Sequence, residues 1–210
     1  NQATGSTSFA ANDYKFFAFS NEFDRGYELK FSIIPANSEI IDNDGRLVDA
    51  TGNTTTANRV GYFASSEAGA LDGPGYFLTA KLFTAGSGNW ARWFPANSRT
   101  YQVWVHVPKG ATATSVRYKI YPKGQPADGS CLTTSTTNPC YQTDAISHNS
   151  NQDRWVRLAA AGVDQFPFVT SSTNSGYVGL VGASIVGGTG GADAVKFINA
   201  ASENKPDLVV

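Results

Sequence analysis

Alternation of hydrophobic and polar positions is clearest near the middle of the chain. In the stretch YQVWVHVP, residues 101–108, every second position is a tyrosine or valine, and the positions between them hold Gln102, Trp104 and His106. A period of two predicts a β-strand whose two faces have different surroundings. The β-branched and aromatic face is typical of a side that packs on a core. Pro108 ends the strand.

Short runs of the same character recur along the chain, separated by turns rich in Gly, Pro and Asn. They occupy residues 14–20, 27–34, 39–45 (a short strand that runs into a turn), 59–64, 76–83, 89–94, 115–121, 154–158, 166–170, 177–186 and 193–198. No segment shows a sustained helical period. Many short strands joined by turns predict an all-β fold, an antiparallel β-sandwich of the jelly-roll, galactose-binding-like type.

The runs divide the chain into one main domain and two ends. Residues 39–199 form the predicted β-sandwich domain, residues 1–38 an N-terminal extension rich in strand-forming residues, and residues 200–210 a C-terminal tail. Residues 122–152 are polar and interrupt the rhythm, so we expect a long surface excursion there. The N-terminal extension either caps the domain's own sheet or pairs with the edge of a neighbouring copy.

The bulk composition excludes several classes of partner. The chain has 210 residues, enough for one large β domain, of which 41% are hydrophobic and 16% charged. Its formal net charge is −1, so no strong field attracts nucleic acid, and no apolar run reaches the ~20 residues that a membrane helix needs. The chain contains no methionine and begins with Asn1. We therefore expect a secreted chain without its leader, or a cloned fragment.

Two cysteines, Cys131 and Cys140, enclose the polar sequence LTTSTTNP. A single pair around so short a loop predicts a disulfide formed in an oxidising, extracellular compartment, and two free thiols are the alternative. Closing this loop would stabilise the protein by roughly 2–3 kcal/mol. Asn53 begins an N-glycosylation sequon with Thr54 and Thr55, which matters only where the source glycosylates such sites.

Five motifs between residues 39 and 199 occur in a recognisable order. They are IIDND at residues 40–44, Trp93, the strand at 101–108 followed by Ala113 and Tyr118, Trp155 with Leu158, and ADAVKF at residues 192–197. This order resembles the golvesin C-terminal, or xanthan-lyase carbohydrate-binding-like, domain. The resemblance implies a β-sandwich module of secreted enzymes and surface proteins, similar to sugar-binding modules, with Trp93 in the core and no shared catalytic set. Residues 1–38 have no counterpart in the family's pattern.

Aromatic side chains are the candidate ligand-binding residues, because sugar rings stack their apolar faces on flat aromatic groups. Trp90 and Arg92 share one face of their predicted strand, and Gln102, Trp104 and His106 share one face of theirs. We expect both sets to point away from the core and to bind a polysaccharide or a cell-surface glycan. The alternative is that a covering loop or the N-terminal strands bury these faces as well.

Motifs for catalysis and metal binding are weak. The chain has two histidines, His106 and His148, and no G-x-S-x-G nucleophile motif, so we expect His106 to be a structural or surface residue. A carboxylate pair for glycoside cleavage stays open, because the sequence does not show which acids meet in space. Asp42 and Asp44 could hold a structural calcium ion, although an Asx turn that ends a strand is the simpler interpretation. We expect no other cofactor.

Three functions are compatible with these observations. The first is a secreted, non-catalytic module that binds polysaccharide or cell-surface glycan through exposed aromatic side chains. The second is a structural subunit of an extracellular filament or surface assembly, a homopolymer joined by strand addition from residues 1–38. The third is a secreted enzyme that acts on polysaccharide. We expect the first, with no nucleic acid partner and no membrane insertion.

Overall fold

The chain folds into antiparallel β-sheets in all the parts that the structure describes. The structure, a computed structural model, describes residues 38–43, 46–49, 54–56, 60–63, 70–73, 75–76, 79–124, 139–170 and 175–202. Every strand pairing within these ranges is antiparallel. The all-β, antiparallel fold predicted from the sequence is therefore confirmed.

Seven strands form the larger sheet, called the first sheet below. Its order is β12 (Arg154–Arg157), β8 (Arg99–Val107), β17 (Val195–Asn199), β1 (Glu39–Ile41), β2 (Arg46–Asp49) and β3 (Thr54–Thr56), and β13 (Phe166–Phe168) pairs with the beginning of β8. The long strand β8 lies between β12 and β17 and is the predicted strand around residues 101–108.

Five strands form the second sheet, and two smaller sheets complete the fold. The second sheet has the order β11 (Tyr141–Gln142), β10 (Lys119–Tyr121), β14 (Tyr177–Val181), β7 (Trp90–Trp93) and β4 (Val60–Phe63). The smaller sheets are β16 (Thr189–Ala192), β6 (Ala80–Thr84) and β5 (Ala70–Gly73), and β15 (Ile185–Val186) with β9 (Ser115–Val116). Two 3₁₀ turns, Gly182–Ser184 and Ala200–Ser202, follow β14 and β17.

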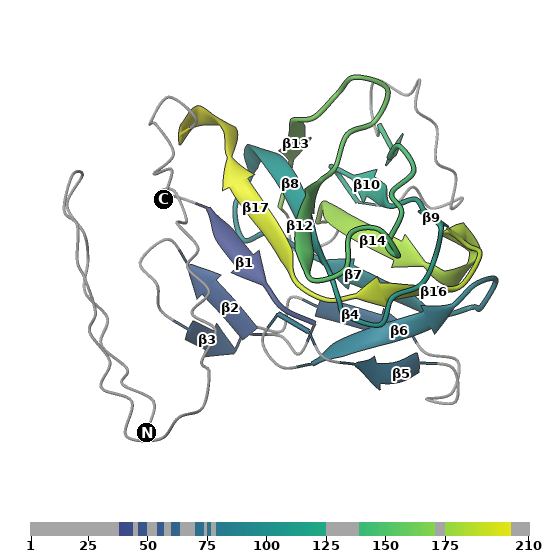
Figure 1. The fold of residues 1–210 in the computed structure, drawn as a ribbon. Helices are drawn as coiled ribbons and strands as arrows, with labels where there is room; N and C mark the ends of the chain where they lie inside the picture. Colours follow the sequence, from purple (N-terminus) through teal and green to yellow (C-terminus); the bar gives the residue numbers. More distant parts are fainter. Residues whose placement is uncertain are drawn as a thin grey trace, which may run out of the picture.

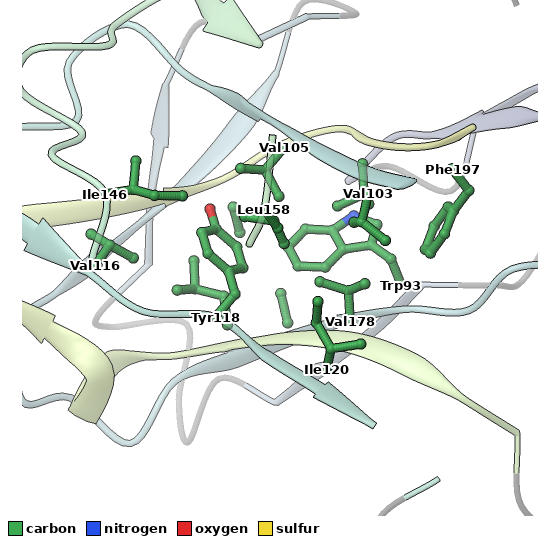
Figure 2. Close-up of a cluster of buried hydrophobic side chains, with 14 of the residues drawn as sticks. Trp93, Val103, Val105, Val116, Tyr118, Ile120, Ile146, Leu158, Val178 and Phe197 are labelled. Carbon is green, nitrogen blue, oxygen red and sulfur yellow. The ribbon is translucent and has the colours of Figure 1, made fainter. Parts of the chain in front are cut away.

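The hydrophobic core lies between the first and second sheets, which Figure 1 shows as two layers. Figure 2 shows Val103 and Val105 of β8 pointing toward Ile120 and Val178 of the second sheet, with Trp93 between the layers. All five side chains are buried. The alternation along β8 therefore does what the sequence predicts for its valine face, and Trp93 occupies the core position that the resemblance implies.

Strands that are far apart in the sequence become neighbours in the first sheet. Ile40 of β1 pairs with Lys196 of β17, and Lys196 pairs with Trp104 of β8. The motifs near residues 40, 101–108 and 192–197 therefore lie side by side (Figure 1). The described strands run from Glu39 to Asn199, within the predicted domain. The jelly-roll connectivity of the strands stays a prediction.

Three local expectations from the sequence were wrong. Residues 177–186, expected as one strand, divide into β14 and β15, because the 3₁₀ turn Gly182–Ser184 lies between them. Residues 115–121, expected as one strand, divide into β9 and β10, because Arg117 N bonds to Ser184 O and Tyr118 N bonds to the Thr143 side chain instead of continuing one ladder. The end of the expected surface excursion also packs inward. Thr143 and His148 are fully buried, and Ile146 joins the core.

Several predictions fall outside the described residues. They include the strands expected within residues 1–37, the middle of the polar excursion at 125–138, the sequon residue Asn53, and Cys131. Cys140 is buried and disulfide-bonded, and the chain contains one other cysteine.

Candidate functional site

The outer face of the second sheet carries the first predicted pair, Trp90 and Arg92. Strand register sets Arg92 of β7 opposite Gly179 of β14, Gly179 opposite Lys119 of β10, and Lys119 opposite Gln142 of β11. Trp93, which alternates with Arg92, points to the core. The side chains of this row therefore point away from the core, and a glycine without a side chain lies between two cations.

Arg92 lies against two aromatic rings on this face. Its guanidinium carbon is 4.3 Å from the ring centroid of Trp90 and 4.8 Å from that of Tyr177. Contacts within about 6 Å of a ring face are favourable for a cation. Trp90 and Arg92 are both half-buried, so these contacts hold the two side chains in place at the surface.

A cluster of further aromatic residues supports the end of the face near Tyr177. The rings of Tyr121 and Tyr177 lie 4.9 Å apart at an interplanar angle of 31°, and Phe94 lies 5.4 Å from Tyr177. The disulfide-bonded Cys140 packs in the same buried cluster. The disulfide bond of Cys140 therefore lies beside these aromatic residues.

Both tyrosine hydroxyls of this cluster remain protonated at neutral pH. Burial raises the pKa of Tyr177, and the positive charge of Arg92 offsets only part of this rise. Burial also raises the pKa of Tyr121, with a smaller opposing effect of Arg92. Neutral phenols of this kind can both donate and accept hydrogen bonds.

Two adjoining hollows run across this face, and together they are called the groove below. The smaller, of about 120 Å³, is lined by Trp90, Ala91, Arg92, Lys119, Tyr121, Tyr177, Gly179 and Val181. The larger, of about 430 Å³, is lined by Ser115, Arg117, Lys119, Gln142, Val181, Ala183, Ser184 and Val186. Lys119 and Val181 line both, so the two hollows are neighbours on the face formed by β7, β14, β10 and β9.

The second predicted set does not form an open platform. Gln102 is 4% exposed and His106 is 3% exposed, so the expectation that both point outward to a ligand was wrong. Trp104 is half-buried, and Lys196 Nζ lies 5.3 Å from its ring centroid. The neighbouring Ile40, on the same face of the first sheet, is 1% exposed. The alternative, in which both faces of β8 are buried, therefore holds at Gln102 and His106, whereas Trp104 keeps part of its surface exposed.

His106 is instead the centre of a buried polar cluster. Its Nδ1 lies 2.6 Å from Asp193 Oδ2, and its Nε2 lies 3.5 Å from Asp153 Oδ1. Asp193 also accepts hydrogen bonds from the backbone N–H of Tyr76, and the rings of Tyr76 and Trp155 lie 5.4 and 5.3 Å from the imidazole. These contacts join β8, β12 and the segment between β16 and β17, which is a structural role.

The predicted calcium site has one described member. Asp42 is fully buried after β1, and Asp44 lies outside the described residues. Within the described ranges, no group of three or more His, Cys, Asp and Glu side chains could hold a metal ion. The same part of the chain contains no helix that is long and apolar enough to cross a membrane.

Sequence reasoning missed most of the groove. It singled out Trp90 and Arg92 but not Lys119, Tyr177 or Gly179, which lie beside them. The only signal was the alternation of residues 177, 179 and 181, and pairing between distant strands decides which of these residues meet Arg92.

Comparison of the chain with protein-family models, with curated proteins and with solved structures found no match.

Proposed function

We propose that the protein is a non-catalytic module that binds a polysaccharide or cell-surface glycan along the groove. The observation that supports this proposal is the adjacency of aromatic rings, cations and small polar side chains around two neighbouring hollows. A sugar chain needs such a surface, because each ring presents apolar C–H faces and a rim of hydroxyl groups.

The lining chemistry favours binding over hydrolysis. Glycoside cleavage normally uses two carboxyl groups on opposite sides of the scissile bond. The described residues that line the groove include no Asp, Glu or His. Trp90, which carries the Arg92 guanidinium on its ring, supplies half-buried aromatic surface in the smaller hollow, and Gln142, Ser115 and Ser184 supply hydrogen-bonding groups in the larger one.

We propose that the protein is located outside the cell. A disulfide persists in oxidising compartments, and Cys140 is disulfide-bonded. The resemblance to the golvesin C-terminal domain agrees with a secreted, sugar-binding role. The alternative role as a filament subunit depends on residues 1–38, of which only Ser38 is described, so it stays a prediction.

The test is retention of the protein on an array of plant, bacterial and animal polysaccharides, both neutral and acidic. Trp90→Ala should lower retention at least tenfold, because it removes the ring at one end of the groove. Gly179→Val should do the same by filling the floor of the smaller hollow, and a β-branched residue suits a strand. A thermal unfolding curve for each variant separates lost binding from lost fold.

Trp104→Ala is the matched control, because Trp104 lies on the outer face of the other sheet. It should leave retention unchanged. Retention that Trp104→Ala abolishes and Trp90→Ala leaves intact would move the site to the first sheet. A folded wild-type protein that is retained on no polysaccharide would refute the proposal.

A further inference from the structure

We infer that the groove selects acidic polysaccharides, whose sugars carry carboxylate or sulfate groups, over neutral ones. This inference rests on the proposed function and adds the chemical class of the ligand. It is supported by the distribution of charge, by the spacing of two cations across a glycine, and by the lack of a counterion for Lys119 among the described residues.

The charge of the groove differs from that of the chain as a whole. The protein has 16 Lys and Arg against 17 Asp and Glu. The groove is lined by three of these cations, Arg92, Arg117 and Lys119, and by no carboxylate among the described residues. An excess of one sign inside a depression attracts ligands of the opposite sign and orients them.

Two of the cations lie on either side of a glycine. Lys119 and Arg92 both pair with Gly179, one from each side, so their backbones are separated by two strand spacings, about 10 Å. Gly179 is buried, and the ring of Tyr177 packs over it, 3.2 Å from the position that a Cβ would take. An acidic sugar bound above this ring would bring its anionic substituent within reach of the Lys119 ammonium or the Arg92 guanidinium.

The ammonium group of Lys119 has no counterion in the described part of the chain. Its side chain is half-buried, and the described residues offer it no hydrogen bond or ion pair. A different cation, Arg157, has an acidic partner 2.9 Å away in Asp164. A partly desolvated cation without a counterion gains more from an incoming anion than from a neutral hydroxyl group.

The third cation is held at the edge of the larger hollow. Arg117 Nη1 donates a 2.8 Å hydrogen bond to the carbonyl oxygen of Thr143, a fully buried residue. The backbone N–H of Arg117 bonds to Ser184 O. The guanidinium is therefore anchored, and a fork of N–H donors suits carboxylate and sulfate groups.

The experiment uses matched pairs of polysaccharides printed on one array. Polygalacturonate, alginate and hyaluronate are each placed beside their carboxyl-reduced neutral forms, and dextran sulfate beside dextran, with neutral glucans, mannans and xylans included. We expect at least tenfold stronger retention of the acidic member of one or more pairs at 0.15 M NaCl. Raising NaCl to 0.5 M should weaken this retention, because salt screens charges.

The variants test whether the groove is responsible. Lys119→Gln with Arg117→Gln should lower retention of the acidic chain at least tenfold. Lys109→Gln with Arg154→Gln removes the same charge from exposed residues that do not line the groove, and it should leave retention within about twofold. Equal loss in both double variants would show non-specific attraction and overturn the inference.

The remaining outcomes distinguish this inference from the proposed function. Equal retention of acidic and neutral members, or retention of neutral chains alone, overturns the selectivity and leaves the proposed function standing. No retention of any printed polysaccharide refutes both. Preference for dextran sulfate alone or for the uronates alone supports the inference and identifies the anionic group.

Discussion

Lowering the pH from 7 to 5 should cost this protein about 2 kcal/mol of stability through one side chain, His148. His148 is fully buried. Its Nδ1 accepts a 3.1 Å hydrogen bond from the backbone N–H of Gly191, and its Nε2 lies 3.4 Å from the hydroxyl of Tyr118, which in turn bonds to Gly191 O. This arrangement suits a neutral imidazole that carries its proton on Nε2.

The size of the effect follows from the pKa. Burial lowers the pKa of His148 from 6.5 to about 4. Between these values the unfolded chain binds a proton that the folded chain does not, so the free energy of unfolding falls as the pH falls from 6.5 to 4 and is at its full value above 6.5. The full difference is about 3 kcal/mol, of which about 2 kcal/mol is lost by pH 5.

The assay is urea unfolding at pH 7, 6, 5.5 and 5, followed by tryptophan fluorescence, since Trp93 lies in the core. In this pH range most carboxylates stay ionised, so protonation of histidine is the main contribution to the change in the free energy of unfolding. A loss of about 2 kcal/mol corresponds to a fall of about 4–8 °C in the melting temperature for a chain of this size. An NMR titration should show one of the two histidine rings still neutral at pH 5.

The control variant is His148→Asn, whose side-chain oxygen can accept the hydrogen bond from Gly191. It lowers the stability at every pH because the bond to Tyr118 is lost, but it removes the titrating group. The stability of the wild type should therefore fall more steeply toward pH 5 than that of the variant. Parallel curves for the two proteins would refute the role of His148.

Three further predictions concern the free energy of unfolding. Gly191→Ala should lower it by about 3 kcal/mol, because the new Cβ would lie 2.1 Å from Pro108 Cγ. Gly179→Ala, whose nearest contact would be at 3.2 Å, should lower it by under about 1 kcal/mol, and equal losses in urea unfolding would contradict this. His106→Leu should cost about 3 kcal/mol, since it removes the side-chain partner of the fully buried Asp193, and a loss below about 1 kcal/mol would argue against this. Cys140→Ser should lower stability by roughly 2–3 kcal/mol, matched by reduction of the wild type, and unchanged stability in both would exclude a structural role of the disulfide.

The sequence predicts the strands whose side chains alternate and misses the short strands β2, β3 and β5 and the glycine-rich strand β16. Strand β8 was predicted from its valines, and β17 from the pattern around Phe197. Strand β16 was not, because its Gly190 and Gly191 carry no side-chain pattern. Gly191 is required by a close contact, since a Cβ there would lie 2.1 Å from Pro108 Cγ, whereas a Cβ at Gly190 would displace the end of the Ile185 side chain, 2.6 Å away. Contacts of this kind come from tertiary neighbours and leave no local signal.

The groove shows the same limit for function. The pattern around Trp90 and Arg92 resembles the pattern around Trp104 and His106, because each alternates aromatic with polar side chains. Alternation establishes that such residues share a face, but whether that face is covered depends on segments elsewhere in the chain. Ile40 is far from Trp104 in the sequence but lies on the same face of the first sheet, and it is buried there.

On the second sheet the outcome depends on the register of β14. Register sets Gly179 between Arg92 and Lys119, and the ring of Tyr177 packs over this glycine, 3.2 Å from where its Cβ would lie. A shift of one residue would turn Val178 or Leu180, both now in the core, toward the outer face and would turn the glycine inward. The burial of Val178 and Leu180 therefore fixes the positions of Gly179 and Tyr177 between the two cations, so the packing of the core and the shape of the groove are determined by the same strand pairing.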